Sequence, residues 1–156
     1  MAYQKLQASR LLAVIPSDTV NIPNPGAVAQ SGTTTAGTAN KLTAAGGDFI
    51  NKRVKVGDIV YAGTVAATVT AIDSATVLST SVSIPNSTAY VIYSQTDNPQ
   101  NGCALYCGNK GNISVTTMSG DTVVLNDIPT GLFVPINSIK RINATNTTAT
   151  NLVALW

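Results

Sequence analysis

The chain contains no histidine and no glutamate, and these two absences narrow the functions that it can have. All seven acidic residues are aspartates, and nine Lys and Arg residues bring the formal net charge to +2. Histidine is the side chain that most often transfers protons near neutral pH and the commonest metal ligand. Catalysis by a Ser, Cys or Thr nucleophile beside a histidine base is therefore excluded. The composition predicts a protein that is not an enzyme and has no cofactor.

Charged residues are also scarce, at 10% of the 156 residues, where about a quarter is usual. Such a weak field predicts no nucleic-acid partner. No apolar run approaches the ~18 to 20 residues that span a bilayer, so we expect no membrane partner either. The five apolar residues at positions 11–15 are shorter than the ~7 to 15 of a secretory core, and we infer no signal peptide.

The aspartates occur singly, mostly next to Gly, Ser or Pro, where Asp commonly caps turns. We find neither a phosphate-binding glycine loop nor a calcium loop with regularly spaced oxygen ligands. No catalytic or metal site is predicted from this pattern. A calcium site assembled from distant loops is the alternative that stays open.

The residues that are abundant indicate a β protein. Thr, Val and Ile together make up 49 of the 156 residues, and branching at Cβ favours strands over helices. Twelve Gly, fourteen Asn and seven Pro are spread along the chain as turn formers. This composition predicts an all-β fold with few or no helices, of the sandwich or barrel type.

The two cysteines lie on one predicted strand. Cys103, Leu105 and Cys107 alternate with Ala104 and Tyr106, as residues on opposite faces of a strand do. At ~3.3 Å per residue their Cα atoms would lie ~13 Å apart, about twice the reach of a disulfide. We expect both thiols to be reduced and buried.

Two segments divide the chain. Residues 25–40 are rich in Ala, Gly, Ser and Thr and are typical of a linker, and residues 95–102 are polar and end in Asn101-Gly102. Residues 41–94 between them have the pattern of about five short strands. We therefore predict a sandwich or jelly-roll-like host domain of residues 1–30 and 98–156, interrupted by a small β-barrel or meander of residues 31–97. Within the host part, residues 108–111 are interpreted as a hairpin turn.

Two apolar runs suggest contact with another molecule. Residues 11–15 and 152–156 are apolar on consecutive positions, and the second run carries the only Trp. A strand that is apolar on both faces is buried on both, either as a central strand of a sandwich or between subunits. For the second alternative, the candidate oligomer or capsid interface consists of Leu11, Leu12, Val14, Ile15, Leu152, Val153, Leu155 and Trp156.

Several pieces of the host part resemble the spike-base family of tailed-phage and gene-transfer-agent heads. They are residues 16–23, 103–108, 111–115, 120–124, 128–131, 135–136 and 141–155. The resemblance implies a small β protein that oligomerises on the capsid surface, at the vertices, as the platform for a spike or fibre, with no active site to transfer. Residues 31–97 interrupt this pattern and are similar to small β modules inserted in other phage virion proteins.

These observations together predict a virion structural protein on the capsid surface, either a head-decoration or a vertex spike-base protein. The expected partners are further copies of the chain in a trimer or pentamer, the major capsid protein, and a spike or fibre protein. A tail or fibre-adaptor role is one alternative. Another is a carbohydrate-binding module that uses Tyr61, Tyr90 and Tyr93, although a strand Tyr more commonly packs in a core.

Overall fold

All the regular secondary structure in the described part of the chain is β-strand. The computed structural model describes residues 8–156, which form twelve strands and no helix. The predicted all-β class is therefore confirmed, and these residues contain no helix that could cross a membrane. Residues 1–7, the start of the expected host domain, lie outside the described residues.

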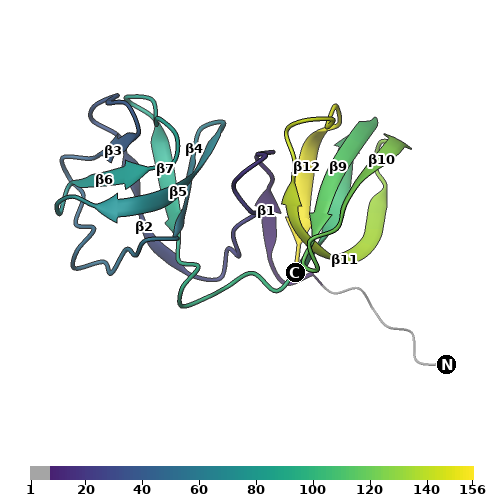
Figure 1. The fold of residues 1–156 in the computed structure, drawn as a ribbon, viewed down its shortest axis with the longest axis horizontal. Helices are drawn as coiled ribbons and strands as arrows, with labels where there is room; N and C mark the ends of the chain where they lie inside the picture. Colours follow the sequence, from purple (N-terminus) through teal and green to yellow (C-terminus); the bar gives the residue numbers. More distant parts are fainter. Residues whose placement is uncertain (1–7) are drawn as a thin grey trace.

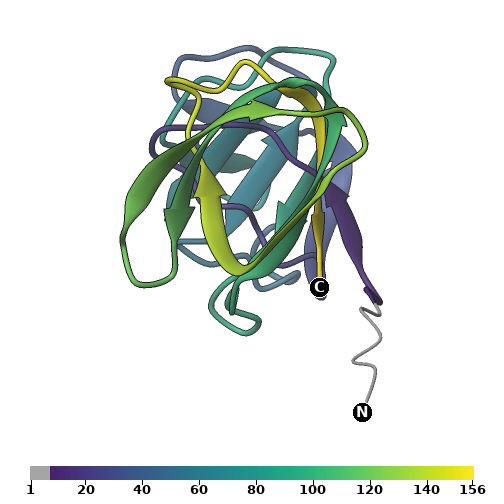
Figure 2. The same cartoon turned by 90° about the vertical axis from the view of Figure 1, so that its right-hand side faces the viewer.

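The strands form two six-stranded sheets, in which every pairing is antiparallel (Figure 1). The first sheet has the order β1-β12-β8-β11-β9-β10 and curls into a half-barrel (Figure 2), and the second has the order β2-β7-β4-β5-β6-β3. The strands of the first sheet are β1 (Leu11–Ala13), β8 (Cys103–Asn109), β9 (Gly111–Thr117), β10 (Thr122–Ile128), β11 (Phe133–Ile142) and β12 (Thr150–Leu155). Those of the second are β2 (Val28–Thr33), β3 (Lys41–Thr43), β4 (Ile59–Ala62), β5 (Val65–Ile72), β6 (Val77–Thr80) and β7 (Ala89–Tyr93).

The two apolar runs near the chain ends lie side by side in the first sheet. β1 pairs with β12, with Leu11 opposite Leu155, and the Trp156 amide donates to the Arg10 carbonyl at 3.1 Å. β12 is an interior strand between β1 and β8, as the central-strand alternative predicts, but β1 is an edge strand, so that alternative is wrong for residues 11–15. β1 can remain at the edge because only Leu12 of its three residues is turned toward the core.

Alternation along β8 builds the core of the first sheet. Cys103, Leu105 and Cys107 are buried, and the residues between them are less so. Both cysteines are free thiols, which confirms the sequence prediction. The same core contains Ile113 and Val115 of β9, Ile139 of β11 and Leu152 of β12, among other residues.

The second sheet has a separate core, around Phe49, Leu42, Leu78 and Ile92. The five strands expected between residues 41 and 94 are present as β3 to β7. The linker expected at residues 25–40 instead contains β2, which pairs with β7 along Val28–Thr33, so the boundary drawn between residues 30 and 31 falls inside a strand. An edge strand needs only one partner, and pairing with β7 overrides the weak strand propensity of Gly and Ser.

The expected hairpin at residues 108–111 is also absent from the described structure, because β11 lies between β8 and β9. The two glycines have another use. A Cβ at Gly108 would overlap the backbone of Asn151, and one at Gly111 would overlap the backbone of Ala149. Glycine at these positions allows the start of β12 and the residue before it to pass close to β8 and β9.

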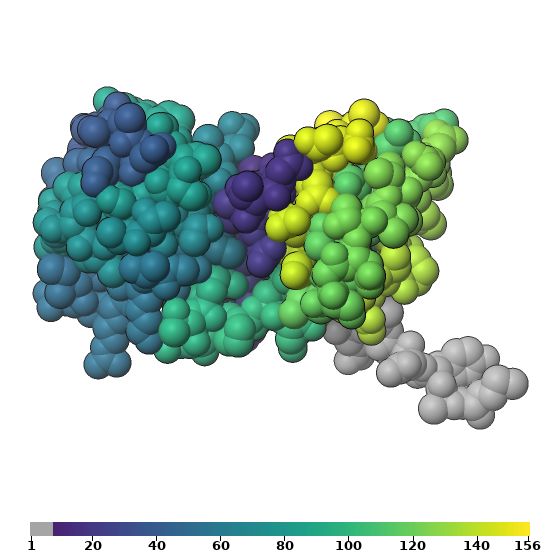
Figure 3. Space-filling view, in the orientation of Figure 1, coloured from purple at the N-terminus to yellow at the C-terminus, as the bar shows by residue number. Residues whose placement is uncertain are grey.

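The two sheets are joined by a third apolar cluster. Tyr61 and Tyr93 of the second sheet pack edge to face, with ring centroids 5.8 Å apart, and Val20 and Ile15 from the segment after β1 contact the same cluster. The space-filling view shows this segment wedged between the two sheets (Figure 3). The segment after β1 is therefore packed, through apolar side chains, against the second sheet.

Asn24 forms hydrogen bonds between the two connections that run from one sheet to the other, β1 to β2 and β7 to β8. Its Nδ2 donates to Asn98 Oδ1 at 3.2 Å, and its backbone amide donates to Gln95 Oε1 at 3.3 Å. The buried Asp58 carboxylate fixes the linker between β7 and β8, residues 94–102, because it accepts a hydrogen bond from the backbone amide of Gln95 at 2.9 Å. It also accepts a hydrogen bond from the backbone amide of Lys55 at 2.8 Å. These bonds hold the walls of the cleft described below.

Candidate interaction surface and inter-sheet cleft

The outer face of the first sheet carries an apolar depression of about 260 Å³. Five side chains from four neighbouring strands line it, and we call them the outer apolar face: Leu11, Tyr106, Phe133, Val153 and Leu155. The strand register puts them together, because Leu11 is opposite Leu155, and Tyr106 is opposite both Val153 and Phe133. Alternate residues of the same strands point to the opposite side and fill the core.

The outer apolar face is well exposed. Leu11 is 63% exposed and Phe133 is 52% exposed. Covering roughly 100 Å² of one aromatic ring contributes on the order of 2.5 kcal/mol at ~25 cal/mol per Å². Contiguous apolar surface of this kind marks an interaction site more often than scattered apolar residues do.

The eight residues expected at an interface divide into three groups. Leu12, Val14, Leu152 and Trp156 pack against the chain's own first core. Ile15 contacts the cluster between the sheets. The remaining three, Leu11, Val153 and Leu155, belong to the outer apolar face.

Sequence reasoning missed two members of this face. Tyr106 and Phe133 are cross-strand neighbours with ring centroids 5.0 Å apart. Tyr106 lies between the core residues Leu105 and Cys107, so its outward orientation follows from strand alternation. Phe133 precedes the core residue Val134 in the same way, but its proximity to Tyr106 depends on the pairing of β8 with β11.

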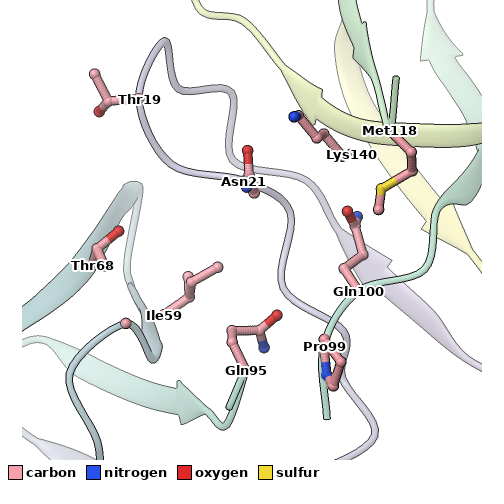
Figure 4. A pocket seen from close by; sticks show the side chains of 10 residues that line it. Thr19, Asn21, Ile59, Thr68, Gln95, Pro99, Gln100, Met118 and Lys140 are labelled. Carbon is pink, nitrogen blue, oxygen red and sulfur yellow. The ribbon is translucent and has the colours of Figure 1, made fainter. Parts of the chain in front are cut away.

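A polar cleft of about 310 Å³ lies between the two sheets (Figure 4). Its walls come from four parts of the chain: the segment after β1, the second sheet, the linker to β8, and the first sheet. The lining residues are Thr19, Asn21, Gly57, Ile59, Thr68, Gln95, Pro99, Gln100, Met118 and Lys140. Hydroxyls, carboxamides and one ammonium group therefore face a common space, beside three apolar side chains.

The cleft has hydrogen-bonding groups but no acid or thiol among its lining residues. No group of three or more His, Cys or acidic residues within residues 8–156 could hold a metal ion. What the cleft provides is a set of donors and acceptors with one positive charge, suited to binding a polar molecule.

The three tyrosines considered for glycan binding are buried. Tyr61 and Tyr93 pack on each other, and Tyr90 packs on Phe49 with centroids 6.3 Å apart. Burial raises the pKa of Tyr61 above its usual value. A tyrosine can bind a sugar by stacking only if its ring is exposed, so the glycan-binding role suggested for these three tyrosines is corrected to core packing.

Burial also explains the state of the thiols. Desolvation raises the pKa of Cys103 to about 12, and it raises that of Cys107 as well. Thiols are the unreactive form, because the thiolate is the nucleophile and the metal ligand. Both cysteines are therefore core residues.

Comparison with known proteins found no matching family model, no matching curated protein and no matching solved structure. The function proposed below is therefore argued from the geometry of the outer apolar face and of the cleft.

Proposed function

We propose that this chain is a structural protein of a phage capsid surface, either a head-decoration or a vertex spike-base protein, that assembles in several copies through the outer apolar face. The observation that carries the proposal is the exposure of Leu11 and Phe133 within one apolar depression.

The arrangement of the two sheets supports this role. Most of the pieces that resemble the spike-base family fall on β8 to β12, so the sheet with the outer apolar face is built largely from those pieces. The second sheet lies beside it with its own core. A capsid protein of this kind would dock through the first sheet and display the second.

A second copy of the chain is the occupant that best fits the face. None of the five lining residues is charged, so water can be displaced from the face without burying an unpaired charge. Closed cyclic symmetry brings the same face of every copy to the rotation axis, where the faces can cover one another. A trimer or a pentamer is the expected assembly, with the major capsid protein below it and a spike or fibre protein above.

Sedimentation of the full chain tests the assembly. We expect the wild type to sediment as a trimer or pentamer, and Leu11→Asp and Phe133→Asp to sediment as folded monomers. Ile50→Asp is the matched control, since Ile50 is 58% exposed and lies between β3 and β4, on the part of the chain that forms the second sheet. A wild type that remains monomeric at its highest soluble concentration would refute self-association through this face.

The position on the virion needs a second experiment. Mass spectrometry and electron microscopy of phage particles that encode the chain should find it on the head, in many copies. Density at the tail would favour the fibre-adaptor alternative, and absence from purified particles would refute the virion role altogether.

A further inference from the structure

The inter-sheet cleft presents polar groups that the fold itself leaves unused. Within residues 8–156, no hydrogen bond involves the side-chain oxygens of Thr19, Thr68 or Gln100, the carboxamide of Asn21, or the ammonium group of Lys140. Figure 4 shows that these side chains come from different segments around the cleft, with Thr19 on the outer side of its loop and turned away from the others. A ligand with several hydroxyl groups can bond to donors and acceptors that are spaced in this way.

Lys140 differs from the other lysines of the described chain in its surroundings. Lys41, Lys55 and Lys110 each form an ion pair with an aspartate, at 2.7 to 2.9 Å. Lys52 is exposed to solvent, whereas Lys140 is half-buried in the cleft, whose lining contains no carboxylate. An anionic group of a ligand would supply the missing partner and form a charge-assisted hydrogen bond.

The rest of the lining restricts the kind of anion. The three apolar side chains of the lining, Ile59, Pro99 and Met118, come from three different segments and none is aromatic, so a nucleobase has nothing to stack on, whereas the C–H groups of a sugar can contact single aliphatic side chains. One lysine suits a carboxylate, whereas phosphate sites commonly add an Arg fork or several backbone amides. The volume of about 310 Å³ is at the lower end of small-molecule sites, about 300 to 1,000 Å³, and fits an end group rather than a long chain.

The cleft is also held in shape before any ligand arrives. The Gln95 backbone amide donates to the Asp58 carboxylate, and the Gln95 side-chain oxygen accepts from the Asn24 backbone amide. Gln95 Nε2 also donates to the Ser94 carbonyl at 3.1 Å. A site with braced walls loses less conformational entropy on binding.

We propose that this cleft binds the terminal residue of an acidic glycan of the uronic-acid type. The sugar carboxylate pairs with the Lys140 ammonium group, the sugar hydroxyls bond to Asn21, Gln100 and Thr68, and the ring lies against Met118. The site goes beyond the capsid role and does not depend on it, and in a virion protein it would serve attachment to a surface polysaccharide.

Titration of the ¹⁵N-labelled full chain with methyl glucuronide and with methyl glucoside tests the proposal, because the two sugars differ only at the acidic group. We expect saturable shifts of the cleft amides with millimolar affinity for the glucuronide and at least tenfold weaker binding of the glucoside. Lys140→Met should weaken glucuronide binding roughly tenfold, the usual order for one charged hydrogen bond, and Asn21→Ala should weaken both sugars.

Lys52→Met is the matched control, since it removes an exposed lysine outside the cleft, and its affinity should equal that of the wild type. The spectra themselves report whether each variant is folded. Absence of saturable shifts, equal affinity for the two sugars, or unchanged binding by Lys140→Met would each overturn the proposal. Leu11→Asp should keep its glucuronide affinity even when self-association is lost, so failure of the glycan site and failure of the proposed assembly can be distinguished.

Discussion

The same Leu→Ala substitution at two positions of β12 distinguishes a residue that stabilises the fold from one that supports association between copies. Leu152 points into the first core and is 3% exposed, whereas Leu155 is half-buried on the outer apolar face, opposite Leu11. Leu→Ala removes three side-chain carbons. At ~0.8 kcal/mol for each, the lost burial at Leu152 is about 2.4 kcal/mol, and a cavity contribution brings the total to about 3 kcal/mol.

Leu155→Ala should cost only about 1 kcal/mol in the isolated chain, because much of that side chain has no protein atoms around it. Urea unfolding measures both values. With a denaturant slope of about 2 kcal/mol per M, Leu152→Ala lowers the midpoint by about 1.5 M and Leu155→Ala by about 0.5 M.

Protein concentration is the deciding variable. If copies associate through the outer apolar face, the loss caused by Leu155→Ala grows with protein concentration, since association stabilises only the folded state. The loss caused by Leu152→Ala should be the same at every concentration. Equal losses for the two variants, or a concentration dependence confined to Leu152→Ala, would refute this assignment of the two faces of β12.

Three further measurements examine individual contacts. Asn24→Ala should lower the free energy of unfolding by about 1 to 3 kcal/mol, because it removes the side-chain hydrogen bonds between the two connections, and calorimetry should show it. Cys103 and Cys107 should resist alkylation in the native chain at pH 8 and should both react in urea, and fast alkylation of the native chain would contradict their burial. Because burial raises the thiol pKa values, the thiols of the unfolded chain ionise at lower pH than those of the folded chain. The free energy of unfolding should therefore fall as pH rises from about 9 toward 12. Hydrogen bonds from the Thr145 amide and hydroxyl lower the pKa of Asp18. The contribution of the Asp18 carboxylate to folding stability is therefore present above pH ~4 and is lost as pH falls below that value. In acid-unfolding curves, the stability difference between wild type and Asp18→Asn should shrink below pH ~4.

Local patterns in the sequence predicted much of the fold. Alternation at Cys103, Leu105 and Cys107 identified a strand and its buried face correctly, because the side-chain period of a strand is two residues whatever its neighbours are. The polar segment before Cys103 was recognised as a connection between the two parts of the chain. The strand β2 was missed because its stability comes from pairing with β7, which is distant in the sequence.

The candidate sites were only partly predictable. Leu11, Val153 and Leu155 belong to apolar runs that stand out in the sequence, but the same runs contain Leu12 and Leu152, which the chain buries itself. The cleft gave no signal, since Asn21, Gln100 and Lys140 are ordinary polar residues far apart in the chain. They come together because the segment after β1 meets both the linker to β8 and strand β11, where the Ile22 amide donates to the Lys140 carbonyl at 2.8 Å.

The amino-acid sequence alone determined the class of this protein: branched residues and scattered turn formers specify strands, and the lack of histidine and glutamate withholds the commonest proton-transfer groups. These are properties of single residues and of short spacing, so no distant contact is needed to establish them. The tertiary structure decided which apolar residues stay exposed and which polar ones share a cleft, because both depend on strand order and register, which couple residues more than a hundred positions apart, as Leu11 and Leu155 are.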